Sequence, residues 1–263
     1  MSAHALLPRL SGHGKVRLIE NGWRLEIPGG GGSHYRLAQL DDLGQLGRPH
    51  FPWRPPVRLH LDARVSGPHL PGTWGFGWWN DPFGSDFSLL RGQRRIPAPP
   101  QAAWFFSASQ TSYLSFRSDR PANGLLAQVF RSAPGRAWPM LATMCLLVNR
   151  RVARRVLARH IEEDAGSVKR DPSNWHHYEI SWNLDSLRLA VDDELILDAS
   201  TQPQPPLGLV IWIDNQFAAF DPQLRLAWGL EPHPEDAWLE IRCLRVGAAS
   251  HPGGDNCRYI GGQ

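Results

Sequence analysis

The sequence has few cysteines, no long apolar run and almost no excess of charge of either sign. Its three cysteines, Cys145, Cys243 and Cys257, are widely spaced and form no Cys-x-x-Cys pair, so free thiols are expected in place of a zinc site. Residues 1–10 lack a basic start followed by an apolar stretch, and no run of about 18 apolar residues occurs anywhere. These absences predict a soluble cytoplasmic protein that has no membrane partner.

The formal net charge of +3 arises from basic and acidic residues that are mixed along most of the chain. Nucleic-acid-binding proteins usually carry a broader basic face interleaved with aromatic rings, so no nucleic-acid partner is expected. The sequence also has no phosphate-binding loop, no dinucleotide fingerprint and no Gly-x-Ser-x-Gly elbow. Nucleotide-dependent enzymes and serine hydrolases are therefore disfavoured.

What the sequence does contain is enough apolar material, 42% of its 263 residues, to bury one core. Turn residues separate many short apolar segments, which is typical of strands. Residues 16–20 and 23–27 flank Asn21-Gly22 and predict a hairpin, and residues 57–65 place apolar side chains on one face only. Further strands are expected at residues 35–41, 102–108, 175–182, 186–191, 195–198, 207–213 and 238–246.

Residues 137–163 differ from the rest because they lack glycine and are rich in Leu, Ala, Met, Arg and Val, which helices tolerate or favour. They predict an amphipathic helix inserted between the early and the late strands. Strands on both sides of this insertion suggest that the two ends of the chain share sheets, as in jelly rolls. We therefore expect a mostly β protein, a single antiparallel β-sandwich domain over residues 1–263 with a helical insertion at about 137–163.

The segment Trp175-His-His-Tyr-Glu-Ile-Ser-Trp182, with the alternating strand and Val191-Asp-Asp that follow, resembles a strand pair of concanavalin A-like glucanases and laminin-G-type domains. Asp193 stands where those sequences have a turn glycine, and aspartate can adopt the same left-handed conformation. Upstream, Gly72-Thr-Trp-Gly-Phe-Gly-Trp-Trp79 occupies the place of a Gly-x-Trp-Pro-Ala-x-Trp strand of glycoside hydrolase family 16. The resemblance implies the concanavalin A-like lectin/glucanase fold.

The resemblance does not extend to the catalytic acids. Family 16 glucanases carry these carboxylates on the next strand as Glu-x-Asp-x-x-Glu, where alternation aims all three into one cleft. In this chain residues 102–109 are Ala-Ala-Trp-Phe-Phe-Ser-Ala-Ser and contain no acid. The family's own catalysis is therefore not expected.

Four tryptophans, Trp78, Trp79, Trp104 and Trp212, are candidates for an aromatic groove, because sugar rings stack well on indoles. Within residues 74–79, rings and glycines alternate, and a glycine inside a strand often marks the close approach of a ligand or another backbone. Alternation lets only part of this set face one groove, and core packing is the alternative for any single member.

Polar residues end two apolar strands, at Asn80-Asp81-Pro82 and at Asp214-Asn215-Gln216. Asp81 and Asp214 are candidates for a catalytic acid–base pair, and with the amides Asn80, Asn215 and Gln216 they are candidates for ligand binding or a calcium site. No other metal or cofactor is expected. Ordinary turn chemistry is the alternative for Asp81.

Three hypotheses about function follow. The first is a protein that recognises a carbohydrate or another flat ligand in the aromatic groove. The second is a glycosidase-like enzyme, which requires Asp81 and Asp214 to lie within about 10 Å of each other. The third is an interaction module whose arginine-rich helix at residues 137–163 meets a partner's acids. The sequence leaves the ligand and the oligomeric state open.

Overall fold

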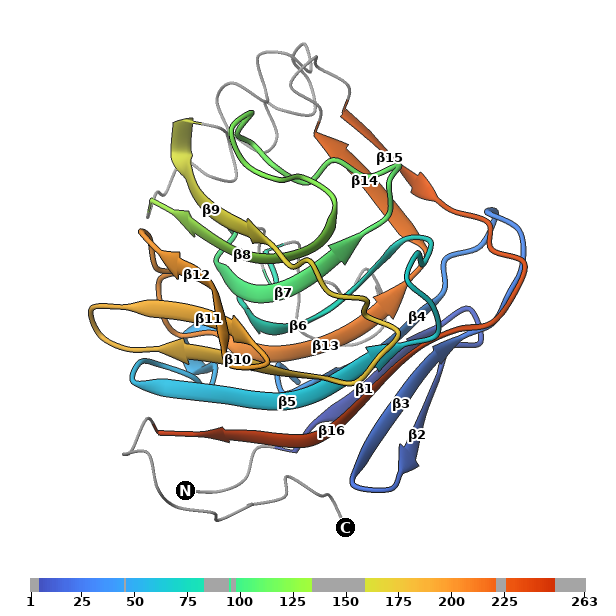
Figure 1. Ribbon diagram of the computed structural model, residues 1–263, viewed down its shortest axis with the longest axis horizontal. Coiled ribbons are helices and arrows are strands. Elements are labelled where there is room, and N and C mark those ends of the chain that lie inside the picture. Colours follow the sequence, from blue (N-terminus) through green and yellow to red (C-terminus); the bar gives the residue numbers. More distant parts are fainter. Residues whose placement is uncertain are drawn as a thin grey trace.

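Two seven-stranded antiparallel sheets form the body of the molecule in the computed structural model, which describes residues 5–44, 46–82, 95, 98–133, 159–220 and 226–248 (Figure 1). The first sheet has the spatial order β1 (Leu7–Ser11), β4 (Leu37–Asp41), β13 (Gly208–Asp214), β6 (Thr73–Trp79), β7 (Ala102–Ala108), β8 (Gly124–Ser132) and β9 (Ile161–Ser167). The second has the order β12 (Glu194–Ala199), β11 (Leu187–Val191), β10 (His176–Trp182), β5 (Val57–Val65), β16 (Ala237–Gly247), β3 (Gly22–Ile27) and β2 (Lys15–Ile19). The predicted antiparallel β-sandwich is confirmed.

Two smaller elements complete the described part of the chain. The strands β14 (Gln216–Phe220) and β15 (Leu226–Leu230) pair with each other as a hairpin, which lies at one end of the sandwich in Figure 1. A 3-10 helix, η1 (Arg48–His50), precedes β5. The connection between β7 and β8 runs beside the hairpin, since the Tyr113 amide donates to the Ala218 carbonyl at 3.0 Å.

The core lies between the two sheets, and strand alternation selects the residues that fill it. In β5 every second residue is buried, as the sequence predicts. From the first sheet, Phe76 and Phe105 point inward and meet the ring of Tyr178 from the second sheet at centroid distances of 5.0 and 4.9 Å. Each such side chain, when fully buried, contributes roughly 1.5–3 kcal/mol from the removal of apolar surface from water.

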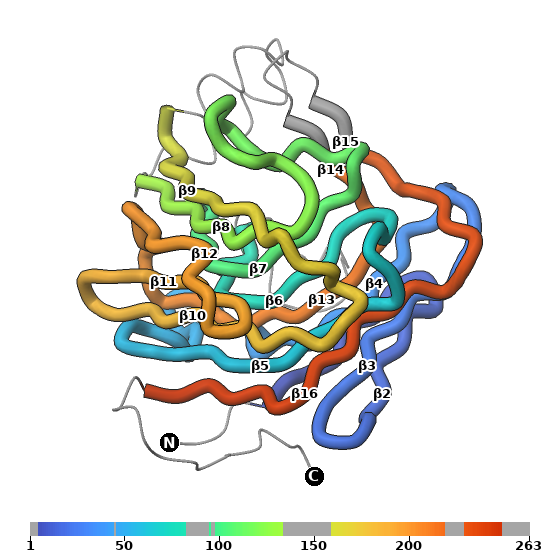
Figure 2. Tube along the Cα trace, viewed as in Figure 1, coloured from blue at the N-terminus to red at the C-terminus, as the bar shows by residue number. Residues whose placement is uncertain are grey.

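Strands that are far apart in sequence are neighbours in both sheets. β13 lies between β4 and β6, and β16 lies between β5 and β3 (Figure 2). The prediction that early and late strands share sheets is therefore confirmed. The second sheet also contains the predicted pair β10 and β11. The turn that leads from β11 to β12 consists of Asp192 and Asp193, whose φ values are 49° and 63°. Asp193 thus takes the left-handed conformation expected where the sequences that this segment resembles have a glycine.

The predicted hairpin of β2 and β3 is present, but its turn lies one residue earlier than expected. Ile19 pairs with Gly22, so the two loop residues are Glu20 and Asn21, and only Asn21 of these is recorded with a positive φ, 60°. Gly22 is required for another reason. A Cβ atom there would lie 1.9 Å from the carbonyl oxygen of Ile241 on β16, so the close approach of the neighbouring strand selects glycine.

The helical insertion predicted at about 137–163 falls mainly outside the described residues, because residues 134–158 are not among them. Its last five residues are described. Residues 159–160 are helical, whereas for residues 161–163 the prediction is wrong. Residues 161–163 begin β9, which pairs with β8 along its whole length. The alternation of buried Ile161 and Glu163 with exposed Glu162 has the period of a strand, and the pairing partner on β8 decides the conformation.

Among the described residues, no helix has the length and apolar composition needed to cross a lipid bilayer. Cys243 is an exposed free thiol. Cys145 and Cys257 lie outside the described residues.

Candidate functional site

An aromatic cluster covers the outer face of the first sheet, which is the face directed away from the second sheet. We call it the aromatic surface, and its members are Trp79, Trp104, Phe106, Phe130 and Trp212. The Trp104 ring lies at its centre, with centroid distances of 6.0 Å to Trp79, 5.5 Å to Phe106 and 5.4 Å to Trp212. Trp79 and Trp104 keep part of their surface exposed, whereas Trp212 is 8% exposed.

Alternation assigns the predicted tryptophans to two different faces. Trp79, Trp104 and Trp212 share the outer face, whereas Trp78 is completely buried in the core between the sheets, 5.4 Å from the ring of Trp53. The predicted ligand-binding role of Trp78 is therefore wrong. Adjacent residues of a strand point to opposite faces, so Trp78 and Trp79 cannot line the same surface.

Gly75 and Gly77 provide the space in which two of these indoles lie. A Cβ atom at Gly75 would come within 2.7 Å of the Trp212 ring, and one at Gly77 within 2.7 Å of the Trp104 Cβ. Gly77 also has a φ of 149°, a conformation that favours glycine. The alternation of rings and glycines in β6 thus lets neighbouring tryptophans lie against the strand. The close approach expected from these glycines is made by the protein's own side chains and backbone.

A hydrogen-bond relay fixes Trp212 and ends in a buried carboxylate. The Trp212 Nε1 donates to Thr73 Oγ1 at 3.0 Å, and this hydroxyl donates to Asp214 Oδ1 at 2.8 Å. The Tyr35 hydroxyl donates to the other carboxylate oxygen at 3.2 Å. Burial raises the pKa of Asp214 to about 6, although the hydrogen bonds from Thr73, the Gln216 amide and Tyr35 act in the opposite direction. Asp214 is thus the predicted acid that the structure places at the aromatic surface.

A second relay fixes Trp104 in the same manner. Its Nε1 donates to Gln128 Oε1 at 3.3 Å, and Gln128 Nε2 donates to Glu163 Oε1 at 3.1 Å. The other Glu163 oxygen accepts from the Phe116 amide at 2.8 Å, and burial raises the pKa of this carboxyl. Gln128 and Glu163 were not among the predicted site residues. Gln128 could have been found in the sequence, because it is the one polar residue in the apolar segment 125–130.

Asp81 and Asn80 have structural roles at the far end of β6. Asp81 is completely buried and forms an ion pair with Arg95 at 2.6 Å, and its own carbonyl accepts from Arg48. Asn80 uses its side chain to bridge the Pro99 carbonyl and the Gln101 amide, at 2.7 and 3.0 Å. These contacts fix the chain as it leaves the strand.

The structure separates the predicted catalytic pair. Asp214 pairs with Thr73, which is the first residue of β6. Asp81 lies two residues beyond Trp79, which is the last residue of β6. Six residues of strand between these positions span about 20 Å, which exceeds the roughly 6.5–9.5 Å of inverting glycosidases. Asp81 and Asp214 therefore do not act as an acid–base pair.

The amides beside Asp214 divide into one structural and one exposed group. Asn215 is completely buried, accepts from the Arg36 amide at 2.8 Å and donates to the carbonyls of His34 and Glu231 at 3.0 and 3.2 Å. Gln216 is exposed, and its backbone amide donates to Asp214 at 3.1 Å. Of the two amide side chains, only that of Gln216 is available to a ligand.

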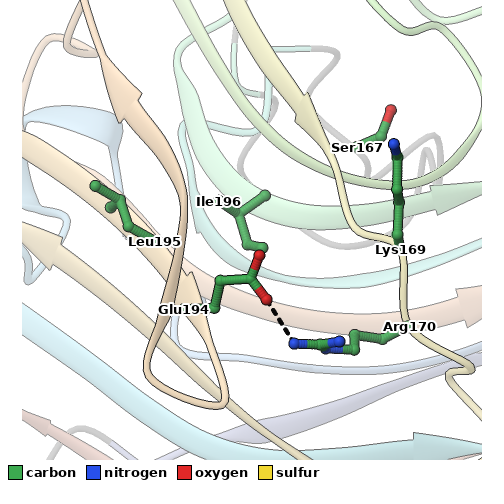
Figure 3. A pocket seen from close by; sticks show the side chains of 6 residues that line it. All are labelled: Ser167, Lys169, Arg170, Glu194, Leu195 and Ile196. Carbon is green, nitrogen blue, oxygen red and sulfur yellow. Dashed lines mark hydrogen bonds and ion pairs between the residues drawn. The ribbon is translucent and has the colours of Figure 1, made fainter.

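The described part of the chain has no cluster of metal-binding side chains, and the hollow described next is small. No three His, Cys, Asp or Glu side chains among the described residues are grouped so that they could hold a metal ion. A hollow of about 260 Å³ lies where the edges of the two sheets meet, below the roughly 300–1,000 Å³ of small-molecule pockets (Figure 3). It is lined by Ser167, Lys169, Arg170, Glu194, Leu195 and Ile196, with an ion pair between Arg170 and Glu194 across it. No aromatic ring lines this hollow.

No protein-family model matches the sequence, and no curated protein matches it. Solved structures do show a likeness. The chain is similar to concanavalin A-like sandwiches. One is a legume lectin-like domain from Entamoeba histolytica, at 10% identity over 92% of this chain and 90% of that one, with a TM-score of 0.46. Another is a glycoside hydrolase family 16 endo-glucanase from Bacteroides ovatus, at 11% identity over 94% and 95%, with a TM-score of 0.49. At such identities the likeness concerns the sandwich alone.

Proposed function

We propose that this protein binds a carbohydrate on the aromatic surface of the first sheet. The observation that carries the proposal is the group of three indoles, Trp79, Trp104 and Trp212, placed outside the core on one face of the sheet. The face of an indole is a broad apolar plane on which the CH groups of a sugar ring pack. Trp79 and Trp104 keep exposed area for such contact.

The relays behind the indoles support a binding role. Hydrogen bonds to Thr73 and Gln128 orient Trp212 and Trp104 before any ligand arrives. A surface that is held in its binding geometry loses less side-chain entropy when a ligand binds. The two carboxylates that end the relays accept hydrogen bonds from protein donors, which suits an orienting role.

The two carboxylates that end the relays are too far apart to act together in hydrolysis. Asp214 and Glu163 belong to strands separated by β6, β7 and β8. Strand pairing places Glu163 level with Trp79 of β6 and Gly208 of β13. Gly208 is six residues from Asp214 along β13. Their separation exceeds about 20 Å, so they do not flank one glycosidic bond.

The test is a titration of the full chain with a panel of neutral oligosaccharides, followed by tryptophan fluorescence and calorimetry. We expect at least one glycan to bind with a change of fluorescence, and Trp104→Ala to weaken its binding. The matched control is Trp238→Ala, a partly exposed tryptophan on the second sheet, for which affinity stays unchanged. Thermal unfolding of both variants separates loss of fold from loss of binding. The proposal is wrong if no glycan binds, or if folded Trp104→Ala binds as well as wild type.

A further inference from the structure

The outer face of the second sheet, directed away from the first, carries charged residues in rows that run across the strands. Arg24, Glu240 and Arg64 are neighbours on β3, β16 and β5, and Arg242 and Asp62 are neighbours in the next row. Glu240 forms ion pairs with Arg24 at 3.2 Å and with Arg64 at 2.8 Å. Asp62 pairs with Arg242 at 3.0 Å. Each acid thus holds an arginine in position.

The acids lie deeper than the arginines. The side chains of Glu240 and Asp62 are 8% and 21% exposed, whereas those of Arg24, Arg64 and Arg242 are 32%, 38% and 41% exposed. Arg64 and Arg242 contact the acids through Nε, and a guanidinium group carries further N–H donors on its two terminal nitrogens. The outermost layer of this face is therefore cationic although the pairs beneath it are nearly neutral.

Two tryptophans orient the arginines further. Arg24 lies 4.3 Å from the ring centroid of Trp238, and Arg64 and Arg242 lie 4.8 and 4.2 Å from that of Trp175. A guanidinium group over an indole is attracted to the ring and holds its plane. The guanidinium groups cover the faces of both indole rings. Single-stranded nucleic acids are usually bound by stacking of bases on uncovered aromatic rings, so a ligand of this face is recognised by its charge instead.

We infer that this face, called here the arginine face (Arg24, Arg64 and Arg242), binds a sulfated polysaccharide. A chain with regularly spaced sulfate groups is complementary to guanidinium groups fixed in neighbouring rows, since the planar fork of arginine matches an oxyanion and the charge of a sulfate does not depend on pH. The arginine face lies on the opposite side of the sandwich from the aromatic surface, so the inference is independent of the function proposed above.

Heparin is the probe, and its affinity for the full chain is measured by calorimetry at several salt concentrations. The double variant Arg64→Gln/Arg242→Gln removes two charges from the arginine face. We expect its affinity for heparin to fall roughly tenfold or more at physiological salt, with a shallower dependence on salt. The matched control is Arg117→Gln/Arg131→Gln, which removes two arginines that are 48% and 45% exposed but pair with exposed acids. Its affinity stays within about twofold of wild type, since those charges are already neutralised at the surface.

Amide hydrogen exchange of the wild-type protein provides a test that needs no variant. Heparin is expected to slow exchange in β3, β5 and β16 and to leave β6 and β7 unchanged. Unsulfated dextran and single-stranded DNA serve as comparison ligands at the same salt. The inference fails if heparin does not bind, if both double variants lose affinity equally, if protection appears in β6 and β7 instead, or if DNA binds more tightly than heparin.

Discussion

Replacement of Gly77 by alanine tests the explanation given for the glycines of β6. Gly77 has a φ of 149°, and a Cβ atom there would lie 2.5 Å from the Ala103 carbonyl oxygen and 2.6 Å from the Trp104 Cα. The strained backbone destabilises the folded state by about 1–3 kcal/mol and the overpacking by a further ~1–3 kcal/mol. Alanine also lowers the entropy of the unfolded chain, which offsets roughly 0.4–1 kcal/mol of this loss. We therefore expect Gly77→Ala to lower the free energy of unfolding by about 1–5.5 kcal/mol.

Three further glycines separate the two contributions. Gly75→Ala places a Cβ atom 2.4 Å from the Phe105 carbonyl oxygen and 2.7 Å from the Trp212 ring, and Gly75 has no positive φ, so overpacking alone should cost about 1–3 kcal/mol. Gly124→Ala meets no atom within 4 Å but has a φ of 77°, so it should cost about 1–2 kcal/mol through strain alone. Gly247→Ala has neither problem and should stay within about 0.5 kcal/mol of wild type.

The assay is urea unfolding at constant pH, monitored by fluorescence and by circular dichroism so that agreement of the two signals supports a two-state transition. If Gly77→Ala is as stable as Gly247→Ala, the close approach of Trp104 does not constrain this position and the explanation is refuted. A second readout is glycan binding. Displacement of β7 by the new methyl group moves Trp104, so Gly77→Ala should weaken binding whereas Gly124→Ala should not.

Other predictions concern the core and two buried carboxyl groups. Phe76→Ala removes a fully buried ring and should lower the free energy of unfolding by about 3–5 kcal/mol in urea; a loss below ~1 kcal/mol would contradict its place in the core. Asp81→Asn leaves the Arg95 charge without its buried partner, so a loss of about 3–5 kcal/mol is expected in thermal unfolding, with unchanged glycan affinity below the transition; an unchanged melting temperature would exclude the ion pair. The pKa of Asp214 rises from 3.8 to about 6 on folding, so the folded state binds more protons. The contribution of Asp214 to the free energy of unfolding is therefore largest below pH 4 and falls by about 3 kcal/mol as the pH rises to 7. Asp214→Asn should make the free energy of unfolding, measured in urea at pH 4.5, 5.5 and 7, depend less steeply on pH. Equal pH dependence in the variant and the wild type would refute the assignment.

The sandwich could be predicted because its signals are local and repeat along the chain. Alternation in residues 57–65 and the pattern of β10 and β11 concern neighbouring residues, and all three strands are present as expected. The position of the β2–β3 turn depends instead on a distant strand. Gly22 is needed where β16 passes, and sequence reasoning assigned that glycine to the turn.

The candidate site shows the same division between local and distant signals. The direction of Trp79, opposite to that of Trp78, follows from alternation once the core face of β6 is known, and that face is set by packing against the second sheet. The relay partner of Trp104 comes from β8, and the buried carboxylate behind it is Glu163 of β9, the last residue of the segment expected to be helical. Pairing between strands brings these groups together, so no spacing in the sequence reports them.

The positions of β13 and β16 also affect how the protein is made. Each occupies an interior place in its sheet, yet both are among the last strands to leave the ribosome. Until then β4 and β6, and likewise β3 and β5, present unpaired backbone edges with a gap one strand wide, and such edges are prone to pair with other chains. The two sheets can therefore be completed only after most of the chain has been synthesised. The yield of folded protein in cells should depend on chaperones that cover strand edges.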